Sequence, residues 1–151
     1  MGTKPNAAPG WPWPDELDAM IAAASSHRKL FENDRVRYLE VIIRPGEFVP
    51  VHTHRWSSVV YVQSTSDFVR RDGEGRVLFD SRQSGVLPKT PAVEWLGPLP
   101  PHSVENVGAS VVHLLIVELK WPRTNRPTKR GTHHEERRGV DRFILDARGR
   151  C

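Results

Sequence analysis

The chain lacks the residues that would place it in several common classes of protein. Its single cysteine, Cys151, is the last of 151 residues, so no disulfide can form within the chain. No apolar run approaches the ~20 residues that a membrane-spanning helix needs, and the beginning of the chain has no apolar signal core. These absences predict a soluble, cytoplasmic protein without a membrane partner.

Hydrophobic residues are also scarce, at 38% of the chain, whereas glycine and proline are plentiful, with 11 and 13 residues. This composition favours a turn-rich β protein over a helical bundle. A length of 151 residues suits one domain with one hydrophobic core. We therefore expect a single all-β domain.

Positive charge is concentrated at one end of the chain. The formal net charge is +4, yet residues 121–151 contain nine Arg or Lys and four Asp or Glu, whereas residues 1–120 contain thirteen and fourteen. A basic tail can bind nucleic acid, but this one has neither a helical register nor interleaved aromatic residues. We expect a mostly disordered tail and no nucleic-acid partner.

Patterns of apolar residues predict one short helix followed by many short strands. Residues 14–26 (PDELDAMIAAASS) combine Pro14 at a first helical turn with an apolar stripe. The predicted strands cover 36–46, 48–54, 57–63, 67–72, 77–81, 92–108 and 110–120. Short, evenly spaced strands favour a closed β-sandwich or barrel. The chain therefore divides into an N-terminal arm and helix (1–35), a β domain (36–120) and the basic tail (121–151).

The N-terminal arm carries two tryptophans, Trp11 and Trp13, on either side of Pro12. Such an arm can dock on its own domain or on a second subunit, and the edge strands of a barrel need cover. We expect a homodimer.

Two histidines one residue apart mark the strand over 48–54. Side chains two residues apart in a strand point to the same face, so His52 and His54 point together. Imidazoles placed in this way can both bind one divalent metal ion. Two surface histidines beside a turn would show the same spacing, so the pair alone leaves both interpretations open.

A second segment, GPLPPHSVENVG at 97–108, carries His102 and, four residues later, Asn106. Together with Gly46, His52 and His54, it resembles the two conserved motifs of the cupin superfamily. The first motif begins with Gly, five residues and His-x-His, and the second ends in His, three residues and Asn. The resemblance implies a cupin double-stranded β-helix, or jelly-roll barrel, over 36–120. It also implies that His102 meets the histidine pair as a third metal ligand.

The chain departs from the first motif at one ligand. The glutamate of the motif falls at position 58 or 59, where this chain has Ser58 and Val59. Three neutral imidazoles would leave a bound ion its full +2 charge. Such centres resemble those of cysteine dioxygenase and acetylacetone dioxygenase cupins. The resemblance implies a mononuclear non-haem Fe(II) dioxygenase acting on a small dicarbonyl or carboxylate. The alternatives are a Zn, Mn or Ni isomerase or lyase, and a non-catalytic cupin that binds a small molecule.

Three further residues are candidates for catalysis. If the gap before the missing glutamate is three residues, Ser58 faces the barrel interior; if it is four, Tyr61 does. Arg70 or its neighbour Arg71 could hold a substrate carboxylate or enolate. Glu94, on the strand that leads to the second motif, is a candidate acid beside the metal ligands.

Overall fold

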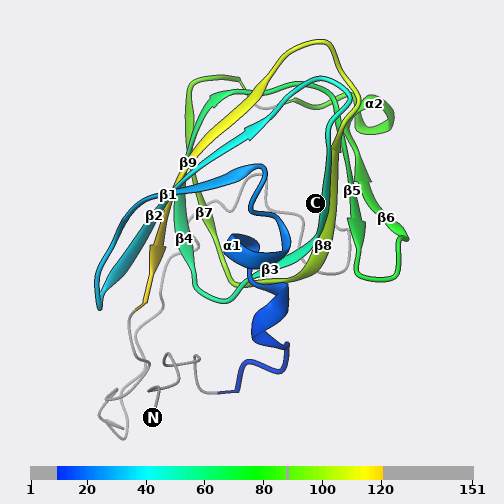
Figure 1. Cartoon of the computed structure of the whole chain (residues 1–151). Coiled ribbons are helices and arrows are strands. Elements are labelled where there is room, and N and C mark those ends of the chain that lie inside the picture. Colours follow the sequence, from blue (N-terminus) through cyan, green and yellow to red (C-terminus); the bar gives the residue numbers. More distant parts are fainter. Residues whose placement is uncertain (1–9, 88, 121–151) are drawn as a thin grey trace, which may run out of the picture.

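Two antiparallel β-sheets face each other around the interior of the domain (Figure 1). The computed structural model describes residues 10–87 and 89–120. The first sheet has the strand order β1-β2-β9-β4-β7, and the second has the order β3-β8-β5-β6. The strands are β1 (His27–Glu32), β2 (Val36–Ile43), β3 (Phe48–His54), β4 (Ser58–Ser64), β5 (Phe68–Asp72), β6 (Val77–Asp80), β7 (Ala92–Leu96), β8 (Leu99–Asn106) and β9 (Val112–Leu119). The all-β prediction is confirmed.

Most predicted strands lie within a few residues of the observed ones. The exception is the strand over 92–108, which is two strands, β7 and β8, separated by Gly97 and Pro98. Proline has no N–H to donate to a sheet, so Pro98 favours the break. After β6 the chain forms a single helical turn, α2 (Ser81–Ser84), which ends at Gly85 with a left-handed φ of 65°.

The N-terminal helix is shorter than predicted, and a strand that the sequence analysis missed follows it. A 3-10 turn (Asp15–Leu17) leads into α1 (Ala19–Ala22), and the Asp18 carboxylate caps α1 by accepting from the Met20 N–H at 3.0 Å. Strand β1 then pairs with β2, with His27 opposite Val41. The sheet therefore begins at residue 27, and the predicted boundary at 36 leaves out this edge strand.

Inward-facing residues change from apolar to polar along the interior. The apolar core consists of Ala23, Leu39, Val41, Ile43, Val49, Val60, Val62, Val112 and Ile116. At one end of β2, β4 and β9, the inward positions belong instead to Arg37, Ser58 and Glu118, each at most 5% exposed. Both Arg37 and Ser58 are direct cross-strand partners of Glu118. Buried polar groups need partners, so this end of the interior is where a site is expected.

No helix among residues 10–87 and 89–120 is long and apolar enough to cross a membrane. The predicted basic tail, with His133, His134 and Cys151, lies outside the described residues, and so do residues 1–9 of the N-terminal arm.

Candidate metal centre

The structure brings together the three histidines that the sequence singled out. His52 and His54 lie on β3, and His102 lies on β8 as the direct cross-strand partner of His52. The ring centroids of His52 and His102 are 4.3 Å apart, and those of His52 and His54 are 5.2 Å apart. All three side chains are buried. A pair two residues apart on one strand and a third histidine on the neighbouring strand thus form one cluster.

Strand β1 adds a fourth histidine, His27, that the sequence analysis did not identify. Its ring lies 4.9 Å from that of His52 and 5.4 Å from that of His54. One nitrogen from each of His27, His52 and His54 lies within 4.8 Å of the other two, a spacing that could hold one metal ion. His102 falls outside this set of three but contacts it through His52. His27 belongs to no motif, and it is the one buried residue of β1.

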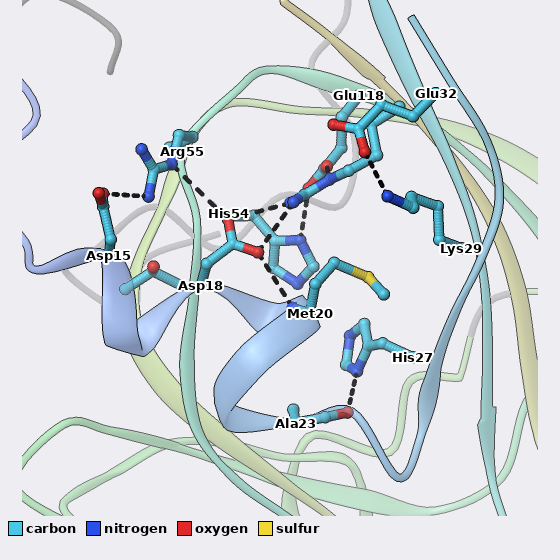
Figure 2. Close-up of polar contacts among 12 residues, drawn as sticks. Asp15, Asp18, Met20, Ala23, His27, Lys29, Glu32, His54, Arg55 and Glu118 are labelled. Carbon is cyan, nitrogen blue, oxygen red and sulfur yellow. Dashed lines mark hydrogen bonds and ion pairs between the residues drawn. The ribbon is translucent and has the colours of Figure 1, made fainter. Parts of the chain in front are cut away.

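The four imidazoles share one hydrogen-bonding pattern. In each ring, Nδ1 faces an oxygen that can only accept, so Nδ1 carries the proton and Nε2 keeps its lone pair. The acceptors are Ala23 O for His27 at 3.1 Å, Pro50 O for His52 at 2.7 Å, Glu118 Oε1 for His54 at 2.8 Å and Pro100 O for His102 at 2.8 Å. Figure 2 shows the contacts of His27 and His54. The same Nδ1 contact is what fixes the tautomer of metal-binding histidines.

A short sequence signal accompanies two of these contacts. His52 and His102 each donate to the carbonyl of a proline two residues earlier, in Pro50-Val51-His52 and Pro100-Pro101-His102. The segments containing them are cross-strand neighbours in β3 and β8. Proline with a histidine two residues later was thus a local indication of ring orientation in both motifs.

Burial keeps three of these histidines, His27, His52 and His102, neutral. Desolvation, reinforced by the neighbouring imidazoles, lowers the pKa of His27 to about 3. Desolvation also lowers the pKa of His52 to about 3 and that of His102 well below its usual range, and the positive charge of Arg70 adds to both effects. Neutral imidazole is the form that binds a metal, so the cluster is ready for an ion at neutral pH.

A buried carboxylate, Glu118, lies behind the cluster, on the far side of the His54 ring. Glu118 accepts from His54 Nδ1 at 2.8 Å and from Arg37 Nε at 2.5 Å. Burial alone would raise the pKa of Glu118, but the hydrogen bonds and charges of His54 and Arg37 lower it, so the carboxyl is ionised. Ser58, at the position of the motif glutamate, is the cross-strand partner of Glu118. The negative charge of Glu118 therefore lies next to the cluster, in contact with the Nδ1 of His54.

The charge of Arg37 ties the N-terminal segment to this carboxylate. Arg37 donates to Asp18 Oδ1 at 2.8 Å and to Asp18 Oδ2 at 3.1 Å, besides its contact with Glu118. Arg55 lies 3.6 Å from Asp18 and donates to Asp15 at 2.7 Å (Figure 2). The capping residue of α1 thus belongs to the buried ion network that holds Glu118, and this network fixes the segment that leads to His27.

The structure settles which residues of β4 face inward. Ser58, Val60 and Val62 are buried, whereas Tyr61 is 40% exposed on the outer face. The prediction that Tyr61 lies beside the metal is therefore wrong, because the gap before the motif position is three residues and strand alternation turns the phenol outward. Glu94, opposite Val60 on β7, faces inward, and burial raises the pKa of its carboxyl.

The two candidate arginines on β5 point to opposite faces. Arg70 pairs in register with the inward-facing Val104, whereas Arg71 forms an ion pair with Glu105 at 2.9 Å. His113 contacts Glu40 at 2.9 Å on the partly exposed outer face and takes no part in the cluster.

The two facing antiparallel sheets give the chain a double-stranded β-helix, the fold of cupins. A cupin domain from Bordetella pertussis Tohama I superposes with a TM-score of 0.50 and 20% identity, over 63% of this chain and 92% of that one. An RmlC-like cupin from Methanocaldococcus jannaschii superposes with a TM-score of 0.45 and 10% identity, over 62% of this chain and 77% of that one. The polyketide cyclase RemF from Streptomyces resistomycificus superposes with a TM-score of 0.43 and 21% identity, over 70% of this chain and 71% of that one.

The sequence by itself does not reveal this likeness to comparison methods. No family model matches the chain, and no curated protein matches it. The motif positions that carry the resemblance are few, and sequence identity to the superposed structures is low. The fold is therefore what the comparisons establish.

Proposed function

We propose that this protein is a metal-dependent cupin whose histidine cluster binds one divalent first-row ion. The observation that carries the proposal is the shared orientation of the four imidazoles. Each Nδ1 is held by an oxygen acceptor, which leaves each Nε2 with a free lone pair, and nitrogens of His27, His52 and His54 lie within 4.8 Å of one another. Burying four imidazoles is less favourable for folding than burying apolar side chains of the same size, unless a ligand binds the free ring nitrogens.

The donor set fits such an ion. Imidazole nitrogen suits Fe, Ni, Cu and Zn, whereas Mg and Ca prefer oxygen. All the candidate ligands are neutral, so a bound ion would keep its +2 charge and supply Lewis acidity toward an oxygen ligand. Glu118 would strengthen His54 as a ligand, because a carboxylate on Nδ1 raises the basicity of Nε2. His27 takes the place in the donor set that the motif gives to glutamate.

The chemical activity that we favour is that of an Fe(II) dioxygenase acting on a small dicarbonyl or carboxylate. A Zn, Mn or Ni isomerase or lyase is the alternative, and imidazole ligands suit Zn and Ni as well as Fe. Oxygen uptake separates the two. We expect the Fe(II)-loaded protein, mixed with pentane-2,4-dione or pyruvate, to consume O₂ in an oxygen electrode, and the His52→Ala variant not to. Lack of uptake by a metal-loaded wild type would favour the redox-inactive alternative.

Metal content tests the binding site itself. His52 contacts each of the other three rings, so His52→Ala removes the centre of the cluster and should weaken metal binding at least about 10–100-fold. His27→Ala should also weaken it, which the cupin motifs alone do not predict. The measurement is metal per chain by mass spectrometry after anaerobic purification without a histidine tag. His113→Ala is the matched control, because this histidine lies outside the cluster.

Two results would contradict the proposal. One is a wild-type chain that takes up no metal after reconstitution with Fe(II), Mn(II), Ni(II) and Zn(II). The other is equal metal in the wild type, His52→Ala and His27→Ala. Either result would favour a cupin that binds small molecules without a metal.

The homodimer and the cytoplasmic location stay predictions. The outer face of β4 and β7 carries exposed large apolar side chains that pair across the two strands, Val59 with Trp95 and Tyr61 with Val93. An apolar outer face on an edge strand supports the expectation of a second subunit.

A further inference from the structure

Arg70 is a positive charge inside the barrel without a partner among the described residues. It lies on β5 opposite Val104, and two residues further along the same pairing Asp72 lies opposite His102. Directly paired residues of antiparallel strands share a face, so the Arg70 side chain lies on the same side as His102. Its Nε is fully buried and has no hydrogen-bond partner among residues 10–87 and 89–120. Desolvation lowers its pKa, yet an arginine remains charged.

Arg70 also lines a cavity that reaches the histidine cluster. The cavity has a volume of about 670 Å³, which is ample for a small metabolite. Its wall includes His102 and Arg70, apolar side chains such as Leu17 and Phe79, and prolines of the segment that leads to the second motif. Part of Arg70 remains exposed, whereas its Nε is not. Arg70 and His102 thus lie on one face and line the same cavity.

The other charged groups of the cavity wall pair with one another. Asp72 accepts from Arg76 Nε at 2.7 Å, and Glu74 forms an ion pair with Arg76 at 2.9 Å. Asp72 also accepts from the backbone N–H groups of Glu74 and Arg76 in the turn between β5 and β6. These carboxylates are committed to the hairpin. Arg70 is therefore the cation of the described cavity wall that remains available to a ligand.

We propose that Arg70 binds the carboxylate of a small anionic substrate that occupies this cavity beside His102. A buried charge is costly unless it is paired, and a ligand carboxylate would supply the missing partner. The guanidinium offers two parallel donors that match a carboxylate, which fixes orientation as well as affinity. The proposal rests on the proposed function in one respect, since it places the rest of the ligand against the metal that the histidines bind.

Two ligands of nearly equal size isolate the carboxylate. Pyruvate and pyruvamide both carry adjacent carbonyl oxygens, but only pyruvate is an anion. Their affinities for the zinc-loaded full chain are measured by titration calorimetry, with Arg70→Gln compared with the wild type. We expect Arg70→Gln to bind pyruvate about 10–100-fold more weakly and pyruvamide unchanged, since one charge-assisted contact is lost. Arg71→Gln is the matched control and should leave both affinities unchanged, because Arg71, the neighbour of Arg70 on β5, pairs with Glu105.

Zinc content is measured on every variant first, so that the two proposals fail separately. A wild type without zinc overturns the proposed function, whereas a zinc-loaded Arg70→Gln that binds pyruvate as the wild type does overturns the role of Arg70. Loss of zinc from Arg70→Gln would also overturn it, because the arginine would then support the histidines. If Arg70→Gln does not fold, Arg70→Lys is measured instead, because lysine keeps the positive charge but lacks the two parallel N–H donors of the guanidinium. It should bind pyruvate more weakly than the wild type, and an unchanged affinity would contradict bidentate binding.

Discussion

Replacing Arg37 with methionine is expected to lower the free energy of unfolding by about 3–5 kcal/mol, the usual cost of breaking a buried ion pair from one side. Arg37 lies between two carboxylates, Asp18 at 2.8 Å and Glu118 at 2.5 Å, and all three side chains are buried. Methionine fills much of the volume but leaves two buried acids with less compensation. The measurement is a urea denaturation curve of the metal-free protein, monitored by circular dichroism at a fixed pH.

The control for this prediction is another arginine of the same sheet. Arg28→Met breaks an ion pair with Glu40 at 2.6 Å, but the Arg28 side chain is 72% exposed, so water screens the charges and replaces the contact. We expect its unfolding curve to match that of the wild type. Equal losses in Arg28→Met and Arg37→Met would show that the buried network of Arg37, Asp18 and Glu118 has no special weight.

Metal-free protein should lose stability steeply as the pH falls from about 6.5 toward 4. His27 and His52 have pKa values of about 3 in the folded protein, against 6.5 for an ordinary histidine. In this pH range these histidines bind protons in the unfolded chain but not in the folded chain, so acid favours unfolding. Each such histidine costs up to about 1.4 kcal/mol per pH unit. The lowered pKa of Glu118 acts in the same direction, because its stabilisation is lost as the carboxylate is protonated.

Unfolding free energies at pH 7.5, 6 and 5 test this slope. In His27→Asn one of the depressed histidines is gone, so the slope should become shallower by up to about 1.4 kcal/mol per pH unit. Zinc added at pH 7.5 should stabilise the wild type, because the ion binds the folded chain, and this gain should shrink toward pH 5 as protons compete for the imidazoles. A stability that does not change from pH 7.5 to pH 5 would contradict the burial of neutral histidines.

Strand patterns were strong enough in this chain to predict the architecture. Residues of β2 alternate regularly between half-buried and buried positions, and the same alternation places His52 and His54 together. Alternation along β4 by itself does not decide which set of its side chains faces the interior. This ambiguity is why Tyr61 was a candidate. The phase became clear only when Ser58 and Val60 were found opposite inward residues of β9, which turns Tyr61 outward.

The site was only partly predictable because its members come from distant segments. His27 follows a short helix, belongs to no motif and reaches His52 only because β1 joins the edge of the sheet beside β2. Glu118 interrupts an apolar run and shares a face with Ile116, two residues earlier, which is buried as well. A charged residue on the inward side of a strand, like a motif histidine, indicates that a partner group lies nearby to neutralise it.

By itself, the sequence determined the all-β class, the short strands and the shared face of His52 and His54, because these depend on composition and on a two-residue repeat within single segments. The resemblance to the cupin motifs added His102. Only the tertiary structure decided that His27 joins the histidine cluster, that Glu118 contacts His54 and that Arg70 lines a cavity with no partner among the described residues. These features depend on which strands lie side by side and on which groups are removed from water, and both are settled by contacts between residues far apart in the chain.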